Sequence, residues 1–389
     1  MSDHSSRPVA IDLFCGAGGL SEGLRQAGFD PRVGLDFDQH AISTYRHNHP
    51  ESRAFLEDVN NVSGQQLIEA ARTDEIDLVA GGPSCQGFST HGKRIEDDPR
   101  NFLFTEFVRL VNEIQPKFFL MENVRGLLTY SKGRFKELIE QSFREIGYNL
   151  VAATVCAADY GVPQLRHRVL FIGTRANSVN LTLPAITHGD DDPSLLPYVT
   201  VEDAISDLPL MKGDCRREIW DYATEPNSDF QEYVRAAQPN HVTLHQANSL
   251  SPQASSIARH VRQGEGLRSV PLEALPDRFK KMRTISNGEL RKDCTTLYHR
   301  LHPAKPSYTI TCYYRNIASG PFLHPWENRS LSHREAARLM SFPDHYEFKG
   351  SAVPRQIGNA VPPLMGKTIG EHIIKMLLAD REDGRRRAA

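Results

Sequence analysis

The residue with the clearest chemical potential is Cys85, which lies in a loop bounded by glycine and proline. The loop, GGPSCQGFS (81–89), comes directly after the apolar run IDLVA (76–80). A cysteine at the point where a buried strand ends lies at the edge of a sheet where ligands bind, and its thiolate is a good nucleophile. Most cysteines are instead inert, buried apolar side chains. The neighbouring motifs must therefore decide between the two interpretations.

A carboxylate and two arginines are predicted to lie at the same edge of the sheet. Glu122 ends the apolar run FFLM (118–121), and a charged residue in that position is more often functional than structural. Arg166 and Arg168 alternate in QLRHR (164–168), which places both on one face of a strand. Arginines on one face can donate to a base or a phosphate, although a surface ion-pair ladder would show the same pattern.

A glycine-rich segment is predicted to bind a nucleoside-type cofactor. DLFCGAGGLSEG (12–23) lies where the first apolar run, VAIDLF, gives way to an amphipathic one, and its glycines let a ligand approach the backbone. Asp36 ends the next apolar run, where its carboxylate could bind ribose hydroxyls, and Phe37 could stack on adenine. On spacing alone a dinucleotide-binding fold explains these residues equally well, and Phe37 could be a plain core aromatic.

These side chains require a scaffold of alternating strands and helices. Short apolar runs alternate with amphipathic stretches up to about residue 176, which predicts an α/β fold with a mostly parallel sheet covered by helices. Periodicity weakens after the acidic stretch HGDDDPSLLPYVT (188–200). We therefore expect a catalytic, cofactor-binding domain over 1–189 and a smaller irregular domain over 190–349. A helix over 350–380 would return to the first domain, and a tail would follow over 381–389.

Composition and charge narrow the class of protein. The 389 residues are 39% hydrophobic and 24% charged, which is typical of a folded globular protein. No run is apolar for the roughly 18 residues that a membrane span needs, so we expect a cytoplasmic protein. The six cysteines are scattered, and no metal site is expected.

The charge is unevenly distributed along the chain. Net charge is only -2, but residues 190–232 hold 12 Asp and Glu against 3 Lys and Arg. Residues 233–330 hold 14 Lys and Arg against 6 Asp and Glu. A local basic surface of this kind can contact phosphates.

Taken together, the ordered motifs resemble those of the DNA cytosine-5 methyltransferase family over nearly the whole chain. DLFCGAGGLSEG looks like the family's first cofactor motif, GGPSCQGFS its nucleophile loop, ENV (122–124) its catalytic glutamate and QLRHR its base-site arginines. RSLSHREAARLMSFPD (329–344) and RQIGNAVPP (355–363) resemble its two carboxyl-terminal motifs. One departure is Ser84, which stands where the family usually has a second proline, so the loop could be less rigid.

The resemblance implies a Rossmann-like methyltransferase fold with a target-recognition domain. It implies transfer of a methyl group from S-adenosylmethionine, leaving S-adenosylhomocysteine, to carbon 5 of a cytosine flipped out of a specific double-stranded DNA site. In that mechanism Cys85 adds covalently to carbon 6, Glu122 holds N3, and Arg166 and Arg168 face the O2 edge. The polar loop THGKRIEDDPRN (90–101) would close over the base. The implied cofactor pocket comprises Phe14, Gly16, Gly18, Gly19, Leu20, Asp36, Phe37, Asp58, Val59, Pro83, Leu103, Asn359 and Ala360.

Three alternatives and several further expectations accompany this interpretation. A nicotinamide-dependent oxidoreductase would explain the glycine turn and Asp36, but it leaves Cys85 and Glu122 without a role. An RNA-directed relative with the same catalytic residues stays open, although the Cys-Phe-Thr motif of that subgroup is not seen. A non-catalytic DNA-binding module is disfavoured by the intact motifs. We expect a monomer in a bacterial or archaeal cell, with a restriction endonuclease for the same site left open as a partner.

Overall fold

The structure is a computed structural model that describes residues 7–83, 103–129, 133–176, 179–236, 241–285 and 296–388. Cys85, Ser84 and the predicted lid loop lie outside the described residues. Within the described part of the chain, every helix is too short or too polar to span a bilayer.

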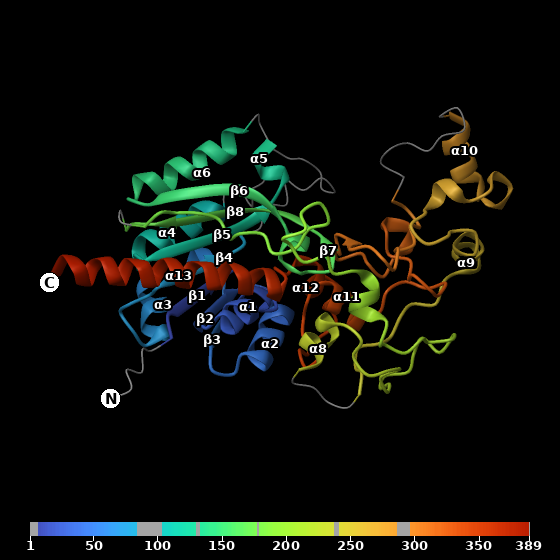
Figure 1. Ribbon diagram of the computed structural model, residues 1–389, viewed down its shortest axis with the longest axis horizontal. Helices are drawn as coiled ribbons and strands as arrows, with labels where there is room; N and C mark the ends of the chain where they lie inside the picture. Colours follow the sequence, from blue (N-terminus) through green and yellow to red (C-terminus); the bar gives the residue numbers. More distant parts are fainter. Residues whose placement is uncertain are drawn as a thin grey trace.

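The centre of the molecule is a seven-stranded sheet, counted over the described residues, in the order β3-β2-β1-β4-β5-β8-β6 (Figure 1). Strands β1 to β5 are parallel, whereas β8 runs antiparallel to both β5 and β6. A second sheet consists of the short parallel strands β7 and β9. The strands are β1 (Val9–Leu13), β2 (Asp30–Asp36), β3 (Arg53–Leu56), β4 (Leu78–Gly81), β5 (Phe118–Val124), β6 (Asn149–Cys156), β7 (Gln164–Leu165), β8 (His167–Thr174) and β9 (Ser307–Tyr308).

Helices cover both faces of the large sheet. The helices of the sheet region are α1 (Gly19–Ala27), α2 (Gln39–Asn48), α3 (Gly64–Ala71), α4 (Leu103–Ile114), α5 (Gly126–Thr129), α6 (Arg134–Glu145) and α13 (Pro363–Ala388). Those of the rest of the chain are α7 (Val201–Ile205), α8 (Asp229–Arg235), α9 (Pro252–Ala258), α10 (Asp277–Ile285), α11 (His333–Leu339) and α12 (Val353–Asn359). Buried residues of α3, α4 and α6 share one apolar cluster with the sheet, and those of α1 and α13 share another.

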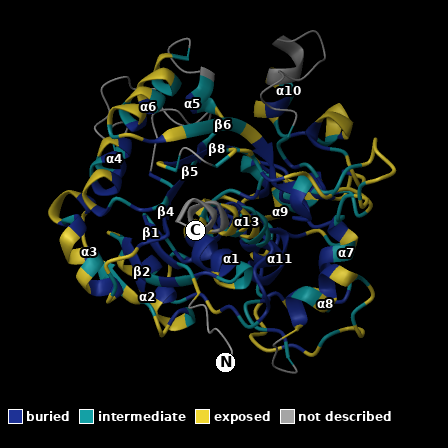
Figure 2. Ribbon diagram, turned by 60° about the vertical axis from the view of Figure 1, so that its left-hand side comes forward, coloured by how far each residue is buried: buried dark blue, intermediate teal, exposed yellow. Residues whose placement is uncertain are grey.

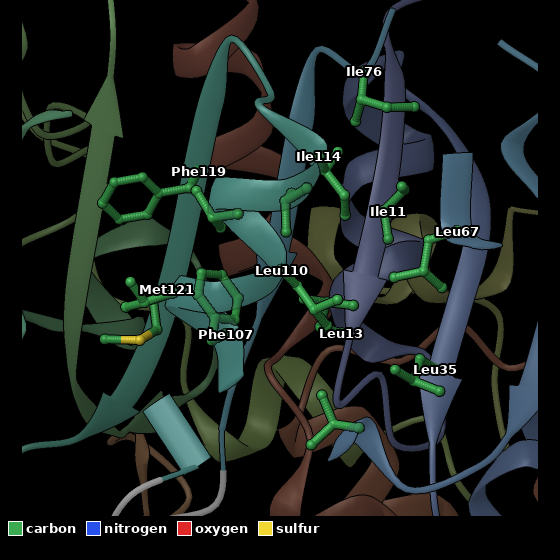
Figure 3. Packing of buried hydrophobic residues seen from close by; sticks show 14 of the residues in the cluster. Ile11, Leu13, Leu35, Leu67, Ile76, Phe107, Leu110, Ile114, Phe119 and Met121 are labelled. Atoms are coloured by element: carbon green, nitrogen blue, oxygen red, sulfur yellow. The ribbon is translucent and has the colours of Figure 1, made fainter. Parts of the chain in front are cut away.

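The alternation of side chains along each strand explains why both faces are covered. In β1, Ile11 and Leu13 belong to the cluster under α3 and α4, whereas Ala10 belongs to the cluster under α1 and α13. In β5, Phe119 and Met121 point to the first side, where they lie near Phe107 of α4 (Figure 3). Strands that are apolar on both faces are typical of parallel sheets covered by helices. The predicted α/β fold with a mostly parallel sheet is therefore confirmed.

The rest of the chain contains two further apolar clusters. One is formed mainly by buried residues between Val201 and Ile357, and it also includes Ala17 of the glycine turn. The other is formed by buried residues between Ile257 and Leu323 and includes part of α9. Figure 2 shows α1 and the inner strands of the sheet as buried, whereas much of the edge strand β6 is intermediate or exposed and the outer surfaces of α3 and α6 are largely exposed.

The carboxyl-terminal part differs from the single helix predicted over 350–380. It forms two helices, α12 and α13, and α13 continues beyond residue 380 as far as Ala388. The break at residues 360–362 coincides with Pro362 and Pro363, because proline cannot continue a helix that precedes it. As predicted for a helix that returns to the first domain, α13 packs against the sheet region. Its start lies close to Gly23 of α1, where a Cβ atom on Gly23 would lie 2.3 Å from the Pro363 carbonyl oxygen.

Candidate active site

The glycine turn at the end of β1 has a backbone that few residues can adopt. Phe14, Gly16 and Gly18 have φ values of 56°, 54° and 89°. The left-handed region costs glycine little, but it is strained for phenylalanine, and such strain is characteristic of functional sites. The turn closes through a hydrogen bond from the Gly18 amide to the Cys15 carbonyl oxygen at 2.9 Å.

Asp36, at the end of β2, holds this turn against the next strand. Its Oδ2 accepts from the Gly16 amide at 2.9 Å, and its Oδ1 accepts from the Asp38 amide at 2.8 Å. Burial raises the pKa of Asp36 above its usual range. Each carboxylate oxygen has a further lone pair, so the group can still bind ribose hydroxyls. Beside it Phe37 is 71% exposed, which contradicts a core role and leaves its ring free to stack on a ligand.

Two residues from the carboxyl-terminal motif lie on the other side of the turn. A Cβ atom on Gly19 would lie 2.4 Å from the Val361 carbonyl oxygen and 3.2 Å from Ala360 Cβ. Asn359, which ends α12, is exposed. The structure therefore brings Gly19 and Ala360 together, although they are more than 300 residues apart in sequence, and Gly16 connects the same turn to Asp36.

The residues around the turn suit a ligand that is partly cationic. Asp12, directly below the turn, is fully buried, and its Oδ2 accepts from the Ser21 hydroxyl at 2.6 Å. Its Oδ1 has no hydrogen-bond partner among the described residues. Burial raises the pKa of Asp12 to about 7, and Asp36 adds to the shift. Among the described residues, no atom lies within 4 Å of the position that a Cβ would take on Gly16, so a ligand could approach the backbone there.

The other predicted pocket residues have different environments. Asp58 is exposed and caps the short 3-10 helix Val59–Asn61 by accepting from the Asn60 amide at 2.9 Å. Val59 is buried in the main core, and Leu103, the first residue of α4, packs against that core. Pro83 is buried and is the last described residue before Cys85.

The candidate base site is formed where β4 and β5 end side by side. Glu122 Oε1 accepts from Arg168 Nε at 2.8 Å, and both side chains are largely buried. A Cβ atom on Gly82 would lie 3.2 Å from Glu122 Oε2, so the carboxylate lies against the start of the nucleophile loop. Gly81, one residue earlier, is paired with Leu13 of β1, next to the glycine turn. The glutamate, the arginine and the start of the two loops are therefore neighbours.

The two arginines of QLRHR do not share one role, contrary to the expectation that they alternate along one strand. The strand is broken at Arg166, because β7 pairs with β9 whereas β8 belongs to the large sheet. Arg166 is fully buried and donates to the carbonyl oxygens of Ile310, Gly358 and Ala360 at 3.1, 3.1 and 2.9 Å. Burial lowers its pKa. In this structure Arg168 faces the carboxylate, and Arg166 ties the sheet to the carboxyl-terminal motif.

Sequence reasoning did not assign a role to Asn123, which the structure places in the site. Its Nδ2 donates to the Pro83 carbonyl oxygen at 3.1 Å, and its Oδ1 accepts from the Val124 amide at 2.8 Å. A buried amide next to the glutamate thus fixes the backbone two residues before Cys85. The ENV motif was the available signal, because a buried asparagine needs partners for both its amide groups.

No group of three His, Cys, Asp or Glu side chains able to hold a metal ion is found within the described ranges.

Comparison with known proteins identifies the family to which this chain belongs. The family model of the C-5 cytosine-specific DNA methylases matches residues 9–375. The chain belongs to this family. The predicted family and the predicted DNA cytosine-5 methyltransferase activity are thereby confirmed, and the nicotinamide-dependent oxidoreductase is excluded.

Individual relatives match nearly the whole methyltransferase chain. A type II methyltransferase of Haemophilus parahaemolyticus is 36% identical over 371 residues, which cover 94% of this chain and 86% of the relative. The type II methyltransferase M.DdeI of Desulfomicrobium norvegicum is 35% identical over 383 residues, covering 93% and 88%.

Solved structures share the fold. A prophage-encoded E. coli protein described as a DNA modification methyltransferase superposes with a TM-score of 0.75 at 28% identity, covering 95% of this chain and 99% of its own. The DNMT2 protein of Spodoptera frugiperda superposes with a TM-score of 0.57 at 18% identity, covering 95% and 99%, and shows the fold alone.

Proposed function

We propose that this DNA cytosine-5 methyltransferase uses S-adenosylmethionine and forms a covalent adduct through Cys85. The observation that carries the proposal is the Glu122–Arg168 pair against Gly82, at the start of the loop that contains Cys85. S-adenosylmethionine supplies an electrophilic methyl group on a sulfonium sulfur. The exposed ring of Phe37, the Asp36 carboxylate and the open face of Gly16 would hold its adenosine part, and S-adenosylhomocysteine would leave from the same residues.

The proposed chemistry begins at the base. Carbon 5 of cytosine is a poor nucleophile, so the Cys85 thiolate adds to carbon 6 and the ring electrons become available at carbon 5. Glu122 gives its proton to N3 or shares it with N3, which stabilises the charge that enters the ring. Arg168 orients the Glu122 carboxylate through its Nε and faces the base with it. After carbon 5 has been methylated, a general base such as a water molecule takes the carbon 5 proton, the C5–C6 double bond forms again, and Cys85 leaves as the thiolate. The proton on N3 returns to Glu122, which leaves neutral 5-methylcytosine.

The target base must leave the duplex to reach this site, because carbon 6 is inaccessible in a stacked helix. We propose that the sheet region, residues 1–189 with 350–380, is the catalytic domain, and that residues 190–349 form the target-recognition domain. The basic stretch 233–330 supports this division, because neutralising phosphates requires a local excess of Lys and Arg. Two of the relatives are type II methyltransferases, so we also propose a companion restriction endonuclease for the same site.

We propose that one chain is sufficient for activity. The glycine turn, Asp36, Glu122, Arg168 and Ala360 all come from a single chain, and no second copy is needed to complete the described site. Action on chromosomal DNA would place the protein in the cytoplasm of a bacterial or archaeal cell.

Covalent trapping tests the proposal. Double-stranded DNA in which the target cytosine is 5-fluorocytosine should give a stable complex with the wild-type protein and S-adenosylmethionine, because fluorine cannot leave as a proton does. Cys85→Ala should give no such complex. The target site is first found by bisulfite sequencing of DNA from cells that express the enzyme.

Two results would contradict the proposal. An equally strong complex with Cys85→Ala would show that another residue is the nucleophile. Efficient trapping on a structured RNA containing 5-fluorocytosine, with none on DNA, would favour the RNA-directed alternative.

A further inference from the structure

Two buried side chains hold the glycine turn from below, and neither belongs to the cofactor motif. Tyr346 follows the FPDH sequence after α11, and its ring packs against Phe342 and Phe348 at centroid distances of 4.9 and 5.6 Å. His49 is the carboxyl-terminal cap of α2. Both are almost completely inaccessible, with 0% and 4% of their surface exposed.

The contacts of these side chains fall on two consecutive peptide groups of the turn. The Tyr346 hydroxyl donates to the Ala17 carbonyl oxygen at 2.6 Å. His49 Nε2 lies 3.3 Å from the Gly18 carbonyl oxygen and 3.1 Å from the Tyr346 hydroxyl oxygen. Since the Tyr346 proton is used toward Ala17, its oxygen is the acceptor for the Nε2–H of His49. Burial lowers the pKa of His49 to about 4, so the ring is neutral and its protonated nitrogen is Nε2.

Fixing the carbonyl groups also fixes the N–H groups, because each peptide unit is planar. The peptide group that contains the Ala17 carbonyl also contains the Gly18 N–H, which closes the turn onto the Cys15 carbonyl oxygen at 2.9 Å. The next peptide group joins the Gly18 carbonyl, which also accepts from the Glu22 amide at 2.8 Å, to the Gly19 N–H. Space around them is minimal: a Cβ atom on Gly18 would lie 2.6 Å from His49 Nε2 and 2.7 Å from the Tyr346 hydroxyl. On the other side of the turn, a Cβ atom on Gly19 would lie 2.4 Å from the Val361 carbonyl oxygen.

Tyr346 also connects the turn to the buried ionic groups of α11. Arg338 donates from Nε and Nη2 to the two carboxylate oxygens of Asp344, at 2.9 and 2.7 Å. The Asp344 amide donates to the Val234 carbonyl oxygen at 2.7 Å, which fixes the backbone two residues before Tyr346. The ring that reaches the turn is therefore held by the part of the chain predicted to bind DNA, and α11 and α12 lie beside α1 at this junction (Figure 1).

We propose that Tyr346, supported by His49, is a positioning residue for S-adenosylmethionine: it orients the Gly18 and Gly19 peptide groups without contacting the cofactor. The proposal rests on the cofactor named under the proposed function. A residue that acts in this way controls the affinity for the cofactor and not the chemistry at the base.

The test is Tyr346→Phe, which keeps the ring and removes one hydroxyl group. Loss of this buried hydrogen bond should raise the Kd for S-adenosylmethionine, measured by calorimetry, by about tenfold. KM for the cofactor should rise by a similar factor, whereas kcat at saturating cofactor and the Kd for DNA should stay within about twofold of wild type.

Tyr314→Phe is the matched control. Tyr314 is also fully buried in the same apolar cluster, and its hydroxyl also contacts a buried histidine, His333. That pair has no contact with the glycine turn among the described interactions, so cofactor affinity should stay within about twofold. His49→Gln is a second variant, which leaves the Tyr346–Ala17 hydrogen bond in place and should weaken cofactor binding in the same direction.

The results of these binding measurements distinguish the proposed cofactor from the proposed positioning role of Tyr346. Wild-type protein that does not bind S-adenosylmethionine would contradict the proposed cofactor. Normal wild-type binding with unchanged affinity in folded Tyr346→Phe, or an equal loss in Tyr314→Phe, would overturn the positioning role. If Tyr346→Phe does not fold, unchanged affinity in His49→Gln decides against it.

Discussion

At the residue scale, the position of the Glu122–Arg168 pair predicts that Glu122 acts in the reaction at the base and not in cofactor binding. Glu122→Gln removes the proton that the base needs at N3 and should lower kcat by roughly a hundredfold or more, as expected for a general acid. The Kd for S-adenosylmethionine should stay within about twofold, because the carboxylate adjoins Gly82 and not the glycine turn. Single-turnover kinetics and calorimetry measure the two quantities.

The matched control for this variant is Glu106→Gln. Glu106 Oε2 accepts from Arg109 Nε at 2.7 Å on α4, so it is a similar pair away from the site, and its loss should leave kcat nearly unchanged. A loss of cofactor affinity as large as the loss of kcat in Glu122→Gln would argue against a role at the base.

Asp12 gives cofactor binding a pH dependence. Its pKa is raised to about 7 by burial, so near pH 7 about half of the molecules have an uncharged Asp12 in the free protein. A cationic ligand above it favours the ionised form, so affinity is greatest above pH 7 and falls as pH falls. Between pH 7 and pH 6 the Kd should rise about fivefold. Asp12→Asn should remove this dependence, and a variant that retains it would place the titrating group elsewhere.

The individual site residues show what can and cannot be predicted from the sequence. Asp36 and Glu122 were assigned from their positions at the ends of apolar runs, because parallel strands bring their carboxyl ends to one edge. Arg166 was assigned to the base from the resemblance to the family's paired arginines, whereas its partners in this structure are 144 to 194 residues away in sequence. Spacing along one strand contains no information about carbonyl groups that only the folded chain brings near.

At the scale of elements, the close packing of α1 against α13 determines how the carboxyl-terminal motif reaches the glycine turn. Gly23 allows the approach, because a Cβ atom there would lie 2.3 Å from the Pro363 carbonyl oxygen and 2.7 Å from the Lys367 amide nitrogen. The α/β pattern of the first 176 residues predicted the sheet and its helices well. The pair Pro362 and Pro363 marks the start of α13 in the sequence. The close approach of α13 to α1 joins residues that are far apart in the chain, which local patterns do not encode.

Gly23→Ala should therefore destabilise the protein by overpacking, with a loss of about 1–3 kcal/mol in the free energy of unfolding. Thermal or urea unfolding measures the change. The control is Glu371→Ala on an exposed part of α13, where a surface ion pair with Lys367 at 3.5 Å is expected to contribute less than about 1 kcal/mol. Equal effects of the two substitutions would show that the α1–α13 contact tolerates an added methyl group.

At the scale of the molecule, the proposed division of labour can be tested by exchanging one apolar cluster as a unit. Buried residues between Ile257 and Leu323 form this cluster, whereas Leu301, Ile310, Tyr314 and Phe322 of the same interval belong to the larger cluster that includes α11. Replacing residues 250–323 by the equivalent segment of a relative with a known different site should transfer that site to the chimera, because base edges specify sequence and the exchanged loops would contact them. Bisulfite sequencing gives the methylated site.

The motifs 329–344 and 355–363 are retained in this exchange. The donor segment must also supply a strand equivalent to β9, which pairs with β7, and the carbonyl group of Ile310, which accepts from Arg166. An active chimera that still methylates the original site would contradict the assignment of this segment to DNA recognition. Single substitutions of exposed arginines in this segment, such as Arg259 and Arg262, should then divide into those that weaken binding to all DNA and those that relax one base pair, at a cost of about 1–3 kcal/mol.

The position of α13 also affects how the enzyme is made. One face of the sheet, including Ala10, Leu78 and Leu120, is covered by Met365, Ile369 and Ile373 of that helix. During translation the strands leave the ribosome long before these residues do, so the nascent chain carries an open apolar face for most of its synthesis. A truncated message would yield a protein that keeps this face exposed and is therefore a substrate for chaperones and proteases.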